Sequence, residues 1–218
     1  MRKVIIFGLH DFAELAHFYL TNDSEYEVVA FTVSKDYLIM DSFKDLPVVP
    51  FENIEDLFPP EKYLFFVPMA PVKMNMMRMN VYIQAKAKGY RFINYVSSKA
   101  TILGSIAGEN CFILENNTIQ PFTKIGNNVV LWSGNHIGHH SEIMDHVMFT
   151  SHVVLSGHCK VEPYCFLGVN STVRDGVNLK EGTLVGMGAC IIKDTEPWSI
   201  YLGNPGKKSE NKNSKDSM

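Results

Sequence analysis

Six histidines gather in a short stretch of this 218-residue chain, and they are the residues best suited to chemistry. Imidazole changes its charge near neutral pH, so a histidine can accept a proton from an attacking amine or hydroxyl group. Imidazole is also a common ligand of zinc and iron. The stretch therefore predicts either a general base or a metal centre. Its histidines are His136, His139, His140, His146, His152 and His158.

These histidines lie within a six-residue repeat. Every sixth residue from Ile113 to Ile191 is Ile, Leu, Val or Phe, and the residue four places after each is small or compact. This period matches neither an α-helix nor a simple strand, and short repeats indicate a solenoid. Residues 101–206 are therefore predicted to form a left-handed parallel β-helix, in which three hexapeptides close one coil and residues one coil apart stack. One extra residue near Phe112 predicts an imperfect first coil.

The coil geometry separates the two possible chemistries. Four of the histidines recur every six residues, so we expect them to face outward from successive sides of the coil and to diverge. They are His140, His146, His152 and His158, of which His140 should stack directly below His158. Metal-binding β-helices of the γ-carbonic anhydrase type need two histidines five residues apart, and no pair here has that spacing. We therefore expect no metal and favour His139 as a general base, because Gly157, its neighbour one coil along, leaves room for a substrate.

The first hundred residues have a different pattern, in which strand and helix signals alternate. This alternation predicts a Rossmann-like α/β domain with a small parallel sheet over residues 1–100. The expected strands are 4–7, 26–33, 46–49, 63–67 and 90–96, and the expected helices are 12–20 and 75–88. At the other end, residues 207–218 are rich in Lys, Asn and Ser without an apolar pattern, which predicts a disordered tail.

The composition excludes several classes of protein. A net charge of −3 argues against a nucleic-acid-binding face, which needs a basic stripe. No apolar run approaches the roughly 20 residues of a membrane span, and the first residues do not resemble a secretory signal. The four cysteines form no C-x-x-C pair and are expected to be reduced thiols. These features favour a soluble cytoplasmic protein.

Four segments carry a resemblance to a known family. They are IGHHSEIMDHV (137–147), YCFLGVNSTV (164–173), LVGMGACIIKD (184–194) and LGNPGK (202–207). Together with the order of the two domains, they resemble the hexapeptide-repeat sugar acyltransferases that include bacillosamine N-acetyltransferase and the sialic acid O-acetyltransferases. The resemblance covers roughly residues 3–208. It implies acetyl-CoA as co-substrate, a nucleotide-activated or free sugar as acceptor, no metal, and a homotrimer with the coenzyme and His139 in the cleft between subunits.

The resemblance also assigns catalytic residues. The base of the family corresponds to His139, and the acidic residue that follows it in relatives is replaced here by His140. Both histidines are therefore candidate catalytic residues. In relatives the acidic residue stabilises the charged imidazole. Glu142 and Asp145 are the candidates for supplying that charge here, within the chain or across a subunit boundary.

The remaining assignments concern the two ligands. The family's coenzyme contacts correspond to Val169 and Met187, which are one coil apart in the repeat and should share one edge with Ser151. A third contact, a histidine in relatives, corresponds to Met148, which can offer only packing. For Met148 and Met187 the alternative is an exposed residue without a binding role.

The glycine-rich turn that holds the nucleotide sugar in relatives corresponds to Gly8, Leu9 and His10. Only one glycine remains here, and Asp11 is either a helix N-cap or a ligand. The loop 67–71 lacks the glycine found in relatives.

The resemblance favours N-acetylation of an amino group on a nucleotide-linked amino-deoxy sugar. Acetylation of a saccharide hydroxyl group is the closest alternative, because the first turn is atypical. A non-catalytic β-helix scaffold is the alternative from a different class.

Overall fold

The computed structural model describes residues 2–217. The chain forms two compact units, one made of the residues up to 70 together with 80–95, and one made of 71–79 together with the residues from 96 onward. The change of unit after Tyr95 lies close to the predicted division at residue 100. The segment 71–79, which was assigned to the first domain, belongs to the second unit.

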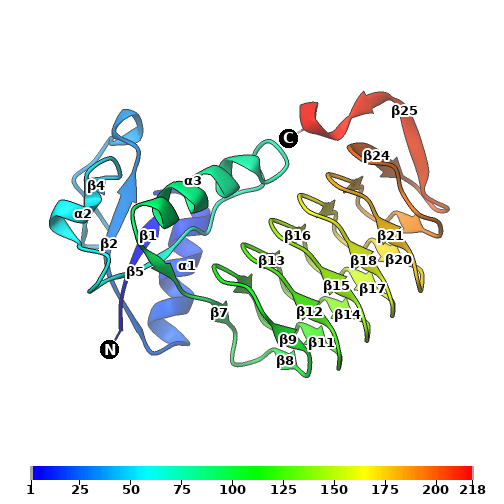
Figure 1. The fold of residues 1–218 in the computed structure, drawn as a ribbon, viewed down its shortest axis with the longest axis horizontal. Helices are drawn as coiled ribbons and strands as arrows, with labels where there is room; N and C mark the ends of the chain where they lie inside the picture. Colours follow the sequence, from blue (N-terminus) through cyan, green and yellow to red (C-terminus); the bar gives the residue numbers. More distant parts are fainter. Residues whose placement is uncertain (1, 218) are drawn as a thin grey trace. The chain divides into compact units, whose positions relative to one another are not determined.

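The first unit is built on a six-stranded sheet (Figure 1). Its strand order is β3-β4-β2-β1-β5-β6, and every neighbouring pair is parallel except β3 with β4. The elements of this part of the chain are β1 (Arg2–Phe7), α1 (Asp11–Asn22), β2 (Tyr26–Val33), η1 (Lys35–Tyr37), β3 (Ser42–Phe43), β4 (Leu46–Pro50), α2 (Ile54–Leu57), β5 (Leu64–Phe66), α3 (Met76–Ala87) and β6 (Arg91–Phe92), and β7 (Tyr95–Val96) follows at the boundary with the second unit. Helix α3 begins in the segment that belongs to the second unit.

The predicted α/β class is confirmed for this unit. The run from Val4 to Phe7 is apolar without interruption because β1 lies between β2 and β5 and is buried on both faces. The strand expected over 90–96 is instead two short strands, β6 and β7, and β7 belongs to a sheet of the β-helix. The short elements β3, α2 and η1 were not predicted.

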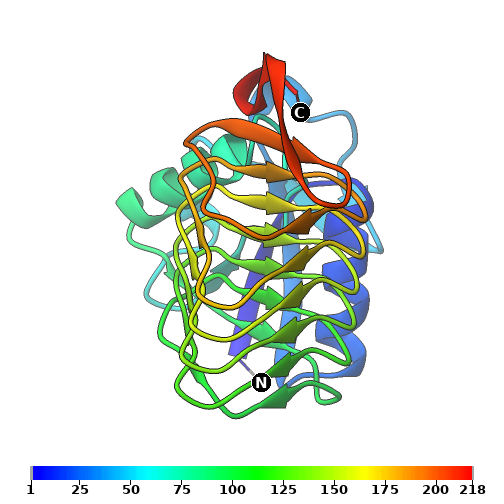
Figure 2. The same cartoon turned by 90° about the vertical axis from the view of Figure 1, so that its right-hand side faces the viewer.

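The second unit is a left-handed parallel β-helix, whose stacked coils are seen in Figures 1 and 2. Its strands form three sheets with the orders β25-β24-β22-β19-β16-β13-β10-β7, β23-β20-β17-β14-β11-β8 and β21-β18-β15-β12-β9. The strands are β8 (Thr101–Ile102), β9 (Ser105–Ile106), β10 (Phe112–Ile113), β11 (Thr118–Ile119), β12 (Lys124–Ile125), β13 (Val130–Leu131), β14 (His136–Ile137), β15 (Glu142–Ile143), β16 (Met148–Phe149), β17 (Val154–Leu155), β18 (Lys160–Val161), β19 (Phe166–Leu167), β20 (Thr172–Val173), β21 (Asn178–Leu179), β22 (Leu184–Val185), β23 (Cys190–Ile191), β24 (Ser199–Leu202) and β25 (Lys207–Asn213).

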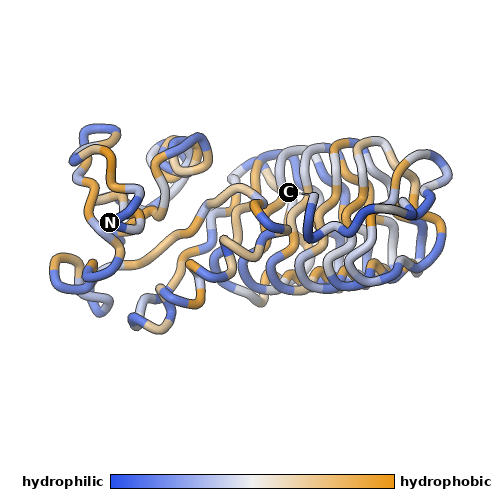
Figure 3. Tube along the Cα trace, turned by 90° about the horizontal axis from the view of Figure 1, so that it is seen from above, coloured by the Kyte–Doolittle hydropathy of each residue, from blue (hydrophilic) through white to orange (hydrophobic). Residues whose placement is uncertain are grey.

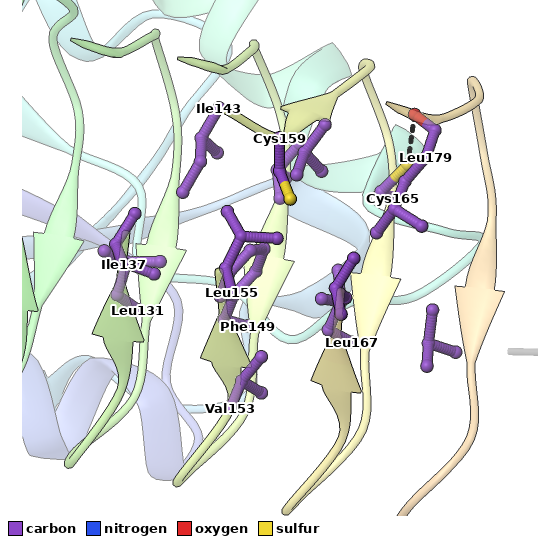
Figure 4. Close-up of a cluster of buried hydrophobic side chains, with 14 of the residues drawn as sticks. Leu131, Ile137, Ile143, Phe149, Val153, Leu155, Cys159, Cys165, Leu167 and Leu179 are labelled. Carbon is purple, nitrogen blue, oxygen red and sulfur yellow. Dashed lines mark hydrogen bonds between the residues drawn. The ribbon is translucent and has the colours of Figure 1, made fainter. Parts of the chain in front are cut away.

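The predicted six-residue period forms the core of the β-helix. All fourteen aliphatic or Phe residues of the series from Ile113 to Ile191 are at most 1% exposed. Figure 4 shows several of them, among them Leu131, Phe149 and Leu167, stacked along the inside of the coils. Figure 3 shows the same periodicity as short hydrophobic stretches on successive turns. The compact residues four places later are buried as well, and several bond to the corner backbone, as Thr123 Oγ1 does to the carbonyl of Gly138 at 3.0 Å.

The predicted irregularity of the first coil is confirmed. Three complete hexapeptides would separate paired residues by 18 positions. Thr118 instead pairs with Thr101, one position fewer, and Lys124 pairs with Ser105, one position more. From Phe112, which pairs with Val130, to Cys190, which pairs with Thr172, each coil contains three complete hexapeptides, whereas the last coil is shorter, with Leu184 paired to Ile200.

The corners of the coils have a feature that was not predicted. Every sixth residue from Asn110 to Gly188 has a positive φ, between 55° and 79°. Such left-handed backbone favours Gly and Asn, which fill eight of these fourteen positions. The fourteen residues are Asn110, Asn116, Phe122, Asn128, Gly134, His140, His146, His152, His158, Tyr164, Asn170, Gly176, Gly182 and Gly188. The four histidines at six-residue spacing therefore lie at corners and not on the flat sides.

The predicted disordered tail is wrong. Residues Lys207–Asn213 form β25, antiparallel to β24, and a short helix, η2 (Ser214–Asp216), follows. Ser214 is buried and donates to the carbonyl of Gly182 at 2.6 Å, and the ammonium of Lys215 lies 4.2 Å from the ring centroid of Trp198. The strand-to-strand bonds use backbone groups, so they leave no apolar pattern in the sequence. Met218 lies outside the described residues.

No helix among the described residues is both long and apolar enough to cross a membrane.

The four cysteines, none of which forms a disulfide within the described chain, differ in burial, which gives a testable prediction. Burial raises the pKa of Cys111 and of Cys165 to about 12, and it also raises the pKa of Cys159, whereas Cys190 is only half-buried. The thiolate is the reactive form, so Cys190 should be the first thiol of the native protein to react with a disulfide reagent, and all four should react after unfolding. Mass spectrometry of the labelled peptides checks the order. Labelling of Cys165 before Cys190 would contradict it.

Candidate functional site

Three histidine side chains meet at one corner of the β-helix. His139 and His140 follow β14, and His158 follows β17 one coil along. The ring centroids of these three residues are 5.2 Å apart for His139 and His140, 5.1 Å for His139 and His158, and 4.9 Å for His140 and His158. The backbone N–H of His158 donates to the carbonyl of His139 at 2.9 Å, so the stacked coils fix the cluster. The predicted stacking of His140 and His158 is confirmed, with ring planes only 13° apart.

The neighbouring coils also shape the position of His139. Its backbone N–H donates to Oε1 of Gln120 at 2.9 Å. A Cβ atom placed on Gly157 would lie 2.8 Å from Cε1 and 3.0 Å from Nε2 of His139. The space beside Gly157, which was assigned to a substrate, is therefore filled by the His139 ring itself. The absence of a Cβ atom at Gly157 therefore makes room for the imidazole of His139.

His139 and His140 are joined by a short contact. Their Nδ1 atoms are 3.1 Å apart, so one must donate and the other accept. When His139 is the donor, its Nε2 atom is left with a free lone pair, which is the arrangement that a general base needs. Phe122 packs on His140 at 4.6 Å between ring centroids and restricts its rotation. His140 is thereby suited to orient His139.

The carboxylates suggested as partners of His139 do not contact it within this chain. Asp145 accepts from the backbone N–H of Asn127 at 2.7 Å and from its side chain at 3.2 Å. Glu142 lies on β15, in register with Lys124 and with Lys160. Among the described residues of one chain, neither acidic group hydrogen-bonds His139.

The other histidines of the stretch do not join the cluster. His152 lies against Gly134, where a Cβ atom would be 2.5 Å from its Nδ1 atom. His146 has its Nδ1 atom 2.9 Å from Nδ2 of Asn128, and its ring stacks on Tyr164. These two residues pack against or bond to neighbouring coils and therefore have structural roles.

The burial of His146 gives a prediction about stability and pH. Burial, with a smaller effect of the Arg78 charge, lowers the pKa of His146 from 6.5 to about 4. Between these values the unfolded chain binds a proton that the folded chain does not, so the free energy of unfolding should fall by about 2 kcal/mol as pH drops from 6.5 to 4. Above pH 6.5 this residue should have no effect. Asparagine suits the left-handed backbone at this corner, so His146→Asn should fold normally. The fall in the free energy of unfolding between pH 7 and pH 4.5, measured by urea titration, should be smaller in this variant by that amount. An unchanged decline would contradict the prediction.

Ser151, Val169 and Met187 share one edge at another corner, as expected, whereas the contact of this edge with a coenzyme stays a prediction. The N–H of Asn170 donates to the carbonyl of Ser151 at 3.1 Å, and the N–H of Gly188 donates to that of Val169 at 2.8 Å, so Ser151, Val169 and Met187 follow one another along this edge. Within the described chain, the N–H groups of these three residues donate to no other group. Met187 is 79% exposed. The edge therefore offers a row of backbone donors beside an exposed apolar side chain.

Met148 does not fit the predicted coenzyme contact. It is only 2% exposed, so its side chain is covered within this chain and is not presented to a ligand. The six-residue period identifies residues that point to the axis, but it does not reveal which outward residues are covered.

The turn after β1 needs the one glycine that it retains, and its role in binding a nucleotide sugar stays a prediction. Gly8 has a φ of 118° and its N–H donates to the carbonyl of Thr32, so a residue without a Cβ atom is needed there. Leu9 is buried, whereas the side chain of His10 is exposed. His10, not Asp11, is the N-cap of α1, and its carbonyl accepts from Ala13 and Glu14. Asp11 lies in the first helical turn, where its charge is favourable.

Gln120, Phe122 and His158 were not predicted as parts of the site. Each lies about one coil from His139 or His140 along the chain, so the coil spacing could have found them.

Comparison with known proteins supports this architecture. Residues 108–139 and 122–157 match the family model described as bacterial transferase hexapeptide (six repeats). The matched residues lie within the six-residue repeat that forms the β-helix. Over 108 residues it is 28% identical to the acyl-[acyl-carrier-protein]--UDP-N-acetylglucosamine O-acyltransferase of Sinorhizobium fredii, a match that covers 46% of this chain and 40% of that relative. The chain thus spans less than half the length of the curated relatives it matches.

Solved structures resemble this chain over nearly its whole length. A perosamine N-acetyltransferase from Caulobacter crescentus, in complex with CoA and GDP-perosamine, has a TM-score of 0.84 and 21% identity, covering 96% of this chain and 97% of the other. The acetyltransferase domain of PglB from Neisseria gonorrhoeae has a TM-score of 0.82 and 20% identity, covering 96% and 100%. The fold expected from the resemblance is confirmed by these similarities.

Proposed function

We propose that this protein is an acetyl-CoA-dependent sugar acetyltransferase that acylates the amino group of a nucleotide-linked amino-deoxy sugar. The observation that carries the proposal is the exposed His139 imidazole, held over Gly157 and against His140 on a β-helix. The similarity of both units to an N-acetyltransferase that binds CoA and GDP-perosamine supports the same class of substrates.

In the proposed mechanism, Nε2 of His139 accepts a proton as the sugar amine attacks the thioester carbonyl. The N–C bond forms, the C–S bond breaks, and the proton passes to the departing sulfur, giving an amide and free coenzyme A. His140 acts as a positioning residue that holds the useful tautomer of His139. Backbone N–H groups at the coil edges are suited to stabilise the negative charge that develops on the carbonyl oxygen.

The two ligands would use separate parts of the chain. The edge of Ser151, Val169 and Met187 is suited to the coenzyme, because its N–H groups have no partner in the described chain and amide carbonyls of coenzyme A need donors. The turn with Gly8 and His10 would hold the nucleotide sugar. This turn leads into the 12-residue helix α1, and the backbone N–H groups at the N-terminus of such a helix can bind phosphates.

A homotrimer with the coenzyme between subunits and a location in the cytoplasm, where acetyl-CoA and activated sugars are made, belong to the same proposal.

The test is release of free thiol from acetyl-CoA by the purified protein with nucleotide-linked amino sugars as acceptors. Formation of the N-acetyl product supports the proposal, whereas transfer to hydroxyl groups only would identify an O-acetyltransferase. The absence of turnover with every nucleotide sugar and free sugar would leave the non-catalytic scaffold as the better assignment.

The contact between His139 and Gly157 gives a further prediction. In Gly157→Ala the new methyl group would displace the imidazole, and a misplacement of about 1 Å is expected to lower kcat by about 10–100-fold. The displaced atoms are the tip of a side chain, so the melting temperature should change little. Adding Gly157→Ala to a His139→Ala variant should cause no further loss, because the two changes act on the same group. Additive losses would show that Gly157 acts in another way.

A further inference from the structure

The histidine corner has a geometry that goes beyond a general base and its positioning residue. The side chains of His139, His140 and His158 each offer one ring nitrogen, and these three atoms all lie within 4.8 Å of one another. All three side chains are exposed, so an ion can reach them from solvent. Neither the family match nor the proposed reaction assigns a function to this convergence.

The spacing of the rings matches that of a three-histidine metal centre. Three imidazoles bound tetrahedrally at Zn–N distances of about 2.0–2.1 Å have ligand nitrogens about 3.4 Å apart and ring centroids about 5.2 Å apart. Here the Nδ1 atoms of His139 and His140 are 3.1 Å apart, and the three centroid separations are 4.9, 5.1 and 5.2 Å. The rings are therefore already placed at the distances that one zinc ion requires.

Only the orientation of the rings must change for binding. The planes of His140 and His158 are nearly parallel, at 13°, and one of them must turn for both nitrogens to point at the same ion. Phe122 packs against His140 and restricts it. The next residue of the same corner column beyond His158 is Gly176, where even an added Cβ atom would meet nothing within 4 Å. His158 is thus the ring that has room to turn.

We propose that His139, His140 and His158 form a binding site for one divalent transition-metal ion, with Zn²⁺ as the best match, and that occupation of this site blocks acetyl transfer. Three neutral imidazoles and an open fourth position suit Zn²⁺, Co²⁺, Ni²⁺ and Cu²⁺, and do not suit Mg²⁺ or Ca²⁺, which prefer oxygen ligands. The metal is an inhibitor and not a cofactor. An imidazole that binds the ion through Nδ1 carries its proton on Nε2, so Nε2 of His139 can then accept no proton from the acceptor, and an ion bound to Nε2 itself would block it directly. The inhibition rests on the proposed function, whereas the binding does not.

The binding test uses the untagged full chain and Co²⁺ as a visible probe. We expect one Co²⁺ per chain, the intense visible absorption of tetrahedral coordination, and displacement by Zn²⁺. Loss of a residue that only hydrogen-bonds to a metal ligand lowers metal affinity by roughly 10–100-fold. His158→Asn removes a ligand itself, so it should weaken Co²⁺ binding by more than this. His152→Asn is the matched control and should bind normally, because His152 is a corner histidine outside the cluster. Both positions have a positive φ, which Asn accepts at Asn116 and Asn170.

A second measurement needs no variant. The electron paramagnetic resonance spectrum of the Cu²⁺-loaded wild-type protein should show splitting from nitrogen ligands. The absence of a tetrahedral Co²⁺ band, binding that His158→Asn leaves unchanged, or a Cu²⁺ spectrum without nitrogen splitting would each overturn the metal site.

The inhibition test measures the acetylated sugar directly, because free Zn²⁺ would bind the thiol of released coenzyme A. We expect product formation to fall as Zn²⁺ occupies the site measured with Co²⁺, and to recover when a chelator is added. Activity that is unaffected at full occupancy would overturn the inhibition. A protein that binds metal but never transfers an acetyl group would contradict the proposed function and leave the metal site intact.

Discussion

Replacement of His139 by alanine is expected to lower kcat for acetyl transfer by about 10²–10⁴-fold, the usual contribution of a general base. His139 is exposed, and its imidazole is fixed by the Nδ1 contact with His140 and by the space at Gly157. Removal of the ring takes away the only group at this corner that we assign as the base. The fold should remain intact, because the side chain is not part of the axial core. Steady-state kinetics with a nucleotide-linked amino sugar provide the measurement.

The control is another histidine of the same stretch. His146→Asn should keep nearly full activity at pH 7.5, because His146 contacts Asn128 and Tyr164 and not the cluster. Coenzyme binding measured by calorimetry should be the same in both variants, since neither changes Val169 or Met187, which we propose as coenzyme contacts. If His139→Ala retained more than a tenth of the wild-type kcat, the general base would be a different group.

The axial core could be predicted from the sequence because every sixth residue is buried on the axis and must therefore be apolar. A polar side chain at Ile137 or Leu155 would leave an unpaired polar group inside the coil. The same period also identified Gly157 as a neighbour of His139, since a residue one coil away must stack on it. The frequent Asn and Gly residues at six-residue spacing could have predicted the left-handed corners. The histidines and Phe122 at equivalent positions conceal that pattern.

The features that were missed depend on contacts without a sequence period. The strand β25 is held by backbone hydrogen bonds, and its side chains are mostly charged or polar. Met148 faces away from the axis, and only the folded chain shows that it is covered. The orientation of His139 against His140 depends on side-chain torsion angles, which the residue types alone do not determine. The coil spacing places His158 beside His140, but the angles at which the three rings meet depend on the same kind of torsion angle.

Replacement of Ile125 by alanine is expected to destabilise the protein by about 2–5 kcal/mol. Ile125 is fully buried on the axis, in register with Ile106 on one side and Ile143 on the other. In a solenoid each coil is stabilised mainly by its neighbours, so one cavity weakens the packing toward both. The midpoint of urea unfolding should shift without a large change in the slope.

The adjacent residue provides a control in the same strand. Lys124 precedes Ile125 in β12, and its side chain is exposed, so Lys124→Ala should change the free energy of unfolding by no more than about 0.5–1 kcal/mol. The contrast between the two variants isolates axial packing, because both replace a long side chain by a methyl group and leave the backbone bonds of β12 in place. An effect of Ile125→Ala that did not exceed that of Lys124→Ala would mean that the coil can collapse around the missing side chain. Such a collapse is incompatible with the strand spacing, because the register of β9, β12 and β15 holds the neighbouring coils apart.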